Sequence, residues 1–141
     1  LTTALANLTA LNLRNANGTN FDPATYASYN TWLLSASATN MAYMLSAQLS
    51  AMYNNVNVRP NTFGGVSGSA LLYAPGATGA NAAGFMTASA LIAEANTSLG
   101  LNGLTVTADA TRTYQEALKN ALDNGNNSRN FVQAAPGTFS F

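Results

Sequence analysis

The sequence predicts a mainly α-helical protein: a small helical bundle of three to four helices with short peripheral β-strands and extended termini. Two observations predict this class. Long stretches carry apolar residues three and four positions apart, which is the period of one helix face. The segments between them are rich in glycine, proline and asparagine, or are short alternating runs that such residues bound. A length of 141 residues suits a single domain over 1–141.

Residues 1–20 are expected to form a loosely attached N-terminal arm. Their leucines fit two patterns, because the first four have helical spacing whereas the last two alternate as in a strand. Asn17-Gly18 is a turn signal near the end of the arm. The leucines of this arm are Leu1, Leu5, Leu8, Leu11 and Leu13.

Asp22-Pro23 predicts the start of the first long helix, since a capping carboxylate precedes a proline whose missing N–H does no harm there. No glycine or proline lies between Pro23 and Asn54. Residues 35–40 are a weak centre with good capping residues, so the stretch is either one helix or two. Its apolar residues at helical spacing are Tyr26, Tyr29, Leu33, Met41, Met44, Leu45, Leu49 and Met52.

The middle of the chain is expected to alternate between loops, short strands and one helix. Residues 54–68 collect asparagines and glycines and predict a loop. Residues 69–74 predict a short strand, which Pro75-Gly76 stops. A helix is expected over 81–99, with Gly100 well placed to end it, and 104–107 fits another short strand.

The last helix has clear local signals. Thr113 and Glu116 have the spacing of a capping box, and Gly125 is placed to close the helix. The tail that follows, 130–141, contains two short runs typical of strands, one at Phe131 and one at 139–141, which Pro136-Gly137 separates. We expect the phenylalanines of this tail to pack against a surface.

The composition excludes several classes of function. Only 7% of the residues are charged, and the chain has no histidine and no cysteine. Catalysis by Ser-His-Asp or Cys-His groups, zinc sites built from histidine and cysteine, and c-type haem attachment are therefore excluded. Five basic residues spread along the chain cannot form the positive surface that nucleic acid requires. No apolar run is long enough for a membrane span. We expect no cofactor and no metal.

The remaining candidate sites are weak. An acid-pair hydrolase needs two neighbouring carboxylates, and Glu94 is the one acid near the apolar side of a predicted helix. We expect a structural or solvated role for it, and no enzymatic activity. Five aromatic residues could stack on sugar rings, but their helical spacing favours core packing: Tyr26, Tyr29, Trp32, Tyr43 and Tyr53. Glycosylation triplets occur at Asn7, Asn17, Asn96 and Asn126.

Several segments resemble a family of bacterial secreted domains that lie near the C-terminal end of long surface proteins, after immunoglobulin-like repeats. The main ones are ATNMAYMLSAQL at 38–49 and TYQEALKNALDN at 113–124. Shorter similar segments lie at 13–16, 21–23, 94–100, 130–133 and 139–141. The resemblance implies a bacterial cell-surface or extracellular location. It implies no particular activity, because the family has none assigned.

These observations favour a non-enzymatic extracellular structural protein, a bacterial surface or matrix subunit that assembles with copies of itself. A near-zero net charge removes repulsion between copies. Apolar terminal segments could be donated to a neighbour, as in strand addition. The alternative is a carbohydrate- or surface-binding adhesion module, with glycans as partners. The residues expected to mediate assembly are Leu1, Leu5, Leu8, Leu11, Leu13, Phe131, Phe139 and Phe141.

Overall fold

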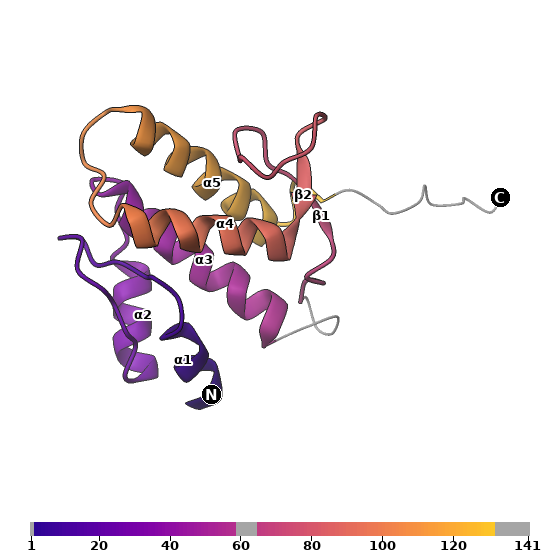
Figure 1. Ribbon diagram of the computed structural model, residues 1–141. Helices are drawn as coiled ribbons and strands as arrows, with labels where there is room; N and C mark the ends of the chain where they lie inside the picture. Colours follow the sequence, from indigo (N-terminus) through magenta and orange to yellow (C-terminus); the bar gives the residue numbers. More distant parts are fainter. Residues whose placement is uncertain (1, 59–64, 132–141) are drawn as a thin grey trace.

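The computed structural model describes residues 2–58 and 65–131 (Figure 1). Within these residues the protein is mainly helical and carries one small antiparallel sheet, so the predicted fold class is confirmed. The elements in chain order are α1 (Thr2–Leu8), α2 (Tyr26–Leu34), α3 (Met41–Asn57), β1 (Leu71–Tyr73), β2 (Phe85–Thr87), α4 (Ala88–Leu101) and α5 (Ala110–Asn126).

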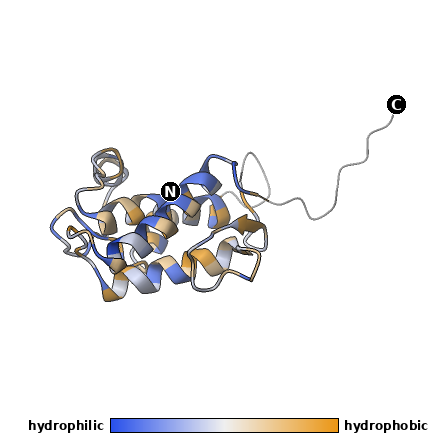
Figure 2. Ribbon diagram, turned by 90° about the horizontal axis from the view of Figure 1, so that it is seen from above, coloured by the Kyte–Doolittle hydropathy of each residue, from blue (hydrophilic) through white to orange (hydrophobic). Residues whose placement is uncertain are grey.

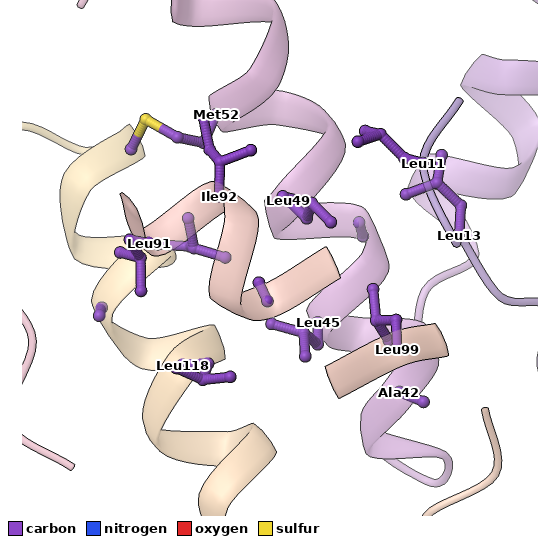
Figure 3. Packing of buried hydrophobic residues seen from close by; sticks show 14 of the residues in the cluster. Leu11, Leu13, Ala42, Leu45, Leu49, Met52, Leu91, Ile92, Leu99 and Leu118 are labelled. Atoms are coloured by element: carbon purple, nitrogen blue, oxygen red, sulfur yellow. The ribbon is translucent and has the colours of Figure 1, made fainter. Parts of the chain in front are cut away.

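Helix α3 is the centre of the bundle and packs against both α4 and α5. In Figure 3, Leu45 of α3 lies between Leu99 of α4 and Leu118 of α5, whereas Leu49 lies between Ile92 of α4 and Leu11. The apolar spacing that predicted the helices is therefore the spacing of the core. Fully buried leucines and methionine of this core include Leu45, Leu49, Met52, Leu91, Leu99, Leu118 and Leu122.

The stretch expected as one helix or two is two helices, α2 and α3. Asn40 ends the break between them as the N-cap of α3, and its side chain accepts the N–H of Ala42. The expected start at Asp22-Pro23 is wrong, because α2 begins at Tyr26. Thr25 is its N-cap, and the Thr25 hydroxyl accepts the N–H of Ser28 in a capping box.

The N-terminal segment is not loosely attached. Leu8 and Leu13 are fully buried in the core of their own chain. The backbone N–H of Arg14 donates to the Ser46 hydroxyl on α3 at 2.9 Å, and the Trp32 indole N–H donates to the Arg14 carbonyl at 3.1 Å. The helical spacing of the first leucines corresponds to α1, whereas the residues after it cross the bundle as an ordered connection.

The predicted strand at 69–74 is confirmed as the shorter β1, which pairs antiparallel with β2. The helix expected from residue 81 is wrong over 81–87, where the chain turns and forms β2. The Asn81 side chain accepts the N–H of Ala83 and of Phe85, and Gly84 has a φ of 92°, which a glycine adopts without strain. Helix α4 therefore begins at Ala88, with Thr87 as its N-cap.

Helix α5 begins earlier and ends later than expected. Asp109 is its N-cap, so the capping box expected at Thr113 and Glu116 is wrong. Gly125 lies inside the helix and is buried. A Cβ atom there would be 2.6 Å from Cε of Met52, so a larger residue would require the flexible end of that methionine to move. The strand expected at 104–107 does not form. The side chain of Thr105 is buried in the core instead.

A buried amide joins three parts of the chain. Asn40 is only 2% exposed, and its Nδ2 group donates to the carbonyls of Asn15 at 3.3 Å and Gly103 at 3.1 Å. Its Oδ1 atom accepts the backbone N–H of Ala42 and, at 2.9 Å, that of Thr105. One side chain thus connects the 15–16 turn, the start of α3 and the connection between α4 and α5.

The network continues through Thr105 to Gln115, which is fully buried on α5. The Thr105 hydroxyl donates to Oε1 of Gln115 at 2.6 Å. The Gln115 Nε2 group donates to the Ser98 hydroxyl and to the Asn102 carbonyl at the end of α4. A neutral amide is suited to this place because it donates and accepts at once without the cost of burying a charge.

Replacing Asn40 with alanine tests this network. The Asn40→Ala change leaves several buried N–H and carbonyl groups without partners, so we expect the free energy of unfolding to fall by about 2–4 kcal/mol. Urea denaturation followed by circular dichroism measures the change. The exposed Asn120→Ala is the matched control and should shift stability by less than about 0.5 kcal/mol. Equal effects of the two variants would contradict the role given to Asn40.

Candidate functional site

Two groups of exposed apolar side chains lie next to the two ends of α4, while Tyr26, Leu34 and Val58 are exposed elsewhere on the described surface. The first group, which we call the sheet end, consists of the exposed Leu71 and Tyr73 and the half-buried Phe85. Leu71 and Tyr73 point away from the core while Leu72 between them is fully buried. Tyr73 pairs with Phe85 across the sheet, and their ring centroids are 5.3 Å apart. Figure 2 shows hydrophobic residues on the strands. The sheet end is therefore an apolar face of two short strands.

The second group, the loop end, consists of Leu101, Leu104 and Val106. Leu101 is the last residue of α4 and is 78% exposed, and the other two follow in the connection to α5 with 55% and 52% exposed. Leu104 and Val106 face outward because Thr105, which lies between them, faces inward. Thr105 is held in that orientation by hydrogen bonds to Asn40 and Gln115. The buried network thus fixes which side chains face outward.

The two ends lie at opposite ends of α4 (Figure 1). The sheet directly precedes the helix, since β2 ends at Thr87 and α4 begins at Ala88, whereas the loop end starts at its last residue. A helix of 14 residues is about 20 Å long. The protein therefore carries two different apolar surfaces that a rigid helix holds apart.

Two arginines near the loop end donate hydrogen bonds to backbone carbonyls. The Arg14 guanidinium donates to the Leu99 carbonyl at 2.8 Å, at the end of α4. Arg112 donates to the carbonyls of Ala38 and Thr105, at 2.6 and 2.7 Å. A cation is favourable at a helix C-terminus, where carbonyls lack helical partners. These contacts brace the connection that carries the loop end.

Five of the residues expected to mediate assembly are described, and they face their own chain. Leu8, Leu11 and Leu13 are buried in the core, whereas Leu5 and Phe131 are partly buried against it. Phe131 forms a bridge with Leu72 at the free edge of β1. Leu1, Phe139 and Phe141 lie outside the described residues.

Sequence reasoning missed the loop end because the alternating pattern of 104–107 was interpreted as a strand. No local signal marks these side chains as exposed. Residues 101–106 read LNGLTV, and apolar residues on both sides of Asn-Gly are also the pattern of a β-hairpin. Their exposure follows from the contacts of Thr105, Arg14 and Arg112 with distant segments.

The Glu94 carboxylate accepts hydrogen bonds from a neighbouring loop. Its two carboxylate oxygens accept the backbone N–H of Thr78 at 2.9 Å and of Gly79 at 2.6 Å. The carboxylate thereby holds the 75–80 loop against α4. Within the described residues, no group of three or more acidic, histidine or cysteine side chains is placed to hold a metal ion. In that part of the chain no helix has both the length and the apolar character needed to cross a membrane.

Most of the aromatic residues considered for sugar stacking are in the core. Tyr29, Trp32 and Tyr43 are buried, and Phe21 stacks on Trp32 with ring centroids 4.4 Å apart. Tyr53 is partly buried against the core, and Tyr26 is exposed. Burial is the largest cause that raises the pKa of Tyr29 and Tyr43, and it also raises that of Tyr114.

The four asparagines of the glycosylation triplets have different surroundings. Asn7 is exposed, and Asn17 is exposed in a turn where its Oδ1 atom accepts the Thr19 N–H. Asn96 accepts the N–H of Asn12 at 2.6 Å. The Asn126 amide nitrogen, where a glycan would be attached, donates to Gln48 instead.

Removing the Glu94 carboxylate should loosen the 75–80 loop. In Glu94→Ala the N–H groups of Thr78 and Gly79 lose their acceptors, so we expect hydrogen exchange at these two amides to become at least about tenfold faster. Exchange measured by NMR gives the rates. The exposed Glu116→Ala is the control and should leave both amides unchanged. Unaltered exchange in Glu94→Ala would show that the loop does not depend on this carboxylate.

Three tyrosines with raised pKa values predict a loss of stability at alkaline pH. The pKa values of Tyr29, Tyr43 and Tyr114 are raised, so the folded state keeps phenolic protons that the unfolded state releases above about pH 10. The contribution of these tyrosines to the free energy of unfolding should be constant up to that pH and should decrease above it. Denaturant titrations between pH 8 and 12 measure it, and Tyr29→Phe should reduce the slope of the fall. A flat profile to pH 12 would contradict this prediction.

Comparison of the chain with protein-family models, with curated proteins and with solved structures found no match.

Proposed function

We propose that this protein is a non-enzymatic structural subunit of the bacterial cell surface or extracellular matrix that assembles with copies of itself into filaments. The observation that carries the proposal is the pair of unlike apolar surfaces, the sheet end and the loop end, at opposite ends of α4. Exposed contiguous apolar side chains mark interaction surfaces in soluble proteins.

The arrangement of the two ends favours an open chain of subunits over a closed dimer. A two-fold dimer uses the same surface on both partners, whereas a contact between two different surfaces repeats from copy to copy. When the sheet end of one copy covers the loop end of the next, each subunit still presents one free surface of each kind. Growth then continues along the direction of α4.

The composition supports close packing of copies. The formal net charge is zero, so long-range repulsion does not oppose association. Arg14 and Arg112, two of the five basic side chains, are engaged with backbone carbonyls of their own chain. The proposed surface location is supported by the composition, rich in asparagine, threonine and serine, and by the resemblance to secreted bacterial domains.

The proposed assembly contact replaces the earlier expectation of a donated N-terminal arm. Donating Leu8 and Leu13 would remove two fully buried side chains from the core of the donor. The loss of such a side chain costs about 2–5 kcal/mol, which the donor recovers only where the arm of another copy fills the same space. Surfaces that are already exposed in the monomer associate without this cost.

Blocking one end at a time tests the proposal. Leu101→Lys places a charge on the loop end, and Leu71→Lys places one on the sheet end. We expect each variant alone to remain monomeric in analytical ultracentrifugation and to show no filaments in electron micrographs, because a lysine at the contact must be desolvated. The exposed Thr97→Lys on α4 is the control and should assemble like the natural chain.

Mixing the two blocked variants distinguishes a head-to-tail contact from other modes. Leu101→Lys retains a working sheet end, and Leu71→Lys retains a working loop end. An equimolar mixture should therefore form dimers of one copy each, and growth should stop there. A natural chain that stays monomeric at high concentration would overturn the proposed function, and filaments in either single variant would overturn the proposed contact.

A further inference from the structure

A cavity of about 370 Å³ opens between α1, α2 and the second half of α3, away from both apolar ends. Its walls are mainly apolar and aromatic side chains of the three helices, with two amides as the polar part: Leu5, Leu8, Tyr26, Tyr29, Ala51, Asn54 and Asn55. The Asn55 amide nitrogen is already bonded to Oδ1 of Asn126. Leu8 is fully buried at this place, whereas Tyr26 is exposed. All of the residues that line the cavity are uncharged. A volume of this size is at the lower end of the range for small-molecule sites.

A chain of hydrogen bonds next to the cavity fixes the orientation of the Asn54 amide. The Ser50 hydroxyl donates its one proton to the Ala47 carbonyl at 2.8 Å. Tyr29, whose hydroxyl is 3.0 Å from the Ser50 oxygen, must therefore be the donor in that pair. Having used its proton, the Tyr29 hydroxyl accepts at its oxygen, and Nδ2 of Asn54 donates to it at 3.3 Å.

This order of donors leaves Oδ1 of Asn54 without a partner. The atom is buried and accepts no hydrogen bond. Turning the amide over would not remove the deficit, because Oδ1 would then face a hydroxyl that has no proton to give. A buried acceptor without a donor costs about 1–3 kcal/mol. The missing group is therefore a hydrogen-bond donor, and the side chain that lacks it is part of the cavity wall.

We propose that this cavity binds a small neutral molecule that has an apolar body of about one ring and a single hydrogen-bond donor, such as a phenol. The leucines and Ala51 would surround the apolar body, and the donor would bond to Oδ1 of Asn54. Oδ1 is covered in this structure, so binding requires the Asn54 side chain to turn toward the cavity, which exchanges its long 3.3 Å bond to the Tyr29 hydroxyl for the bond from the ligand. An acid or an amine does not fit, since the walls carry no opposite charge to pair with it.

Three probes of nearly equal size separate the contribution of the donor from that of the apolar body. p-Cresol has a donor, 4-methylanisole has only an acceptor, and toluene has neither. Isothermal titration calorimetry on the full natural chain gives the three affinities. We expect p-cresol to bind about three- to tenfold more tightly than the other two. In a cavity with no free acceptor the order reverses, because a phenol loses its bonds to water on entering.

Two variants test whether p-cresol binds in this cavity and whether Asn54 is the acceptor of its hydrogen bond. Ala51→Leu fills the cavity and should weaken p-cresol binding by more than about tenfold, whereas Ala93→Leu, an exposed alanine on α4, should leave it unchanged. Asn54→Leu removes the acceptor, so toluene should then bind more tightly than p-cresol. Circular dichroism confirms that each variant is folded.

Three outcomes would overturn the proposal: no saturable binding of any probe, toluene binding the natural chain more tightly than p-cresol, or unchanged p-cresol binding in a folded Ala51→Leu. The first two need only the natural chain, so they decide the matter even if a variant fails to fold. The result is independent of assembly, because the cavity shares no residue with the sheet end or the loop end.

Discussion

The Asn40 side chain is the interaction on which the rest of this structure depends. It caps α3, holds the 15–16 turn and fixes Thr105, and through Thr105 it reaches Gln115 on α5. Each of these elements also packs on apolar neighbours, but apolar packing alone is not directional. The amide network selects one arrangement of the connections, and it does so without a buried charge. A chain with few charged residues and many amides has ample material for this device.

Apolar spacing predicted the helices well, because the residues that make α3, α4 and α5 periodic are also those that meet in the core. Boundaries were predicted less well. Thr25 and Asp109 serve as N-caps where Asp22 and Thr113 were expected, since several residues in each segment have suitable side chains and only tertiary packing selects one. β2 was missed because its three residues are too few to show an alternating pattern, and its pairing partner β1 lies on the other side of the 74–84 connection.

The candidate surfaces were harder to predict than the fold. A single sequence shows which residues are apolar, but whether an apolar side chain is buried depends on contacts with distant segments. The leucines of the N-terminal segment are buried because Ser46 and Trp32 bond to the backbone of Arg14, directly after Leu13. These bonds hold the segment against the core. Leu101 and Leu104 are exposed because Arg14, Arg112 and Asn40 hold the connection from inside. None of these long-range contacts leaves a local pattern in the sequence.

Thr105 lies between two exposed residues, Leu104 and Val106, and its own side chain ends in the core network. A neighbour that covers the loop end would therefore also restrain the segment that holds the hydrogen bonds of Asn40 and Gln115 in place. Association and folding would then be thermodynamically linked, since a partner that binds only the folded state stabilises it by mass action. Subunits inside a filament would resist unfolding more than free monomers do, and the polymer would act as a reservoir of folded protein.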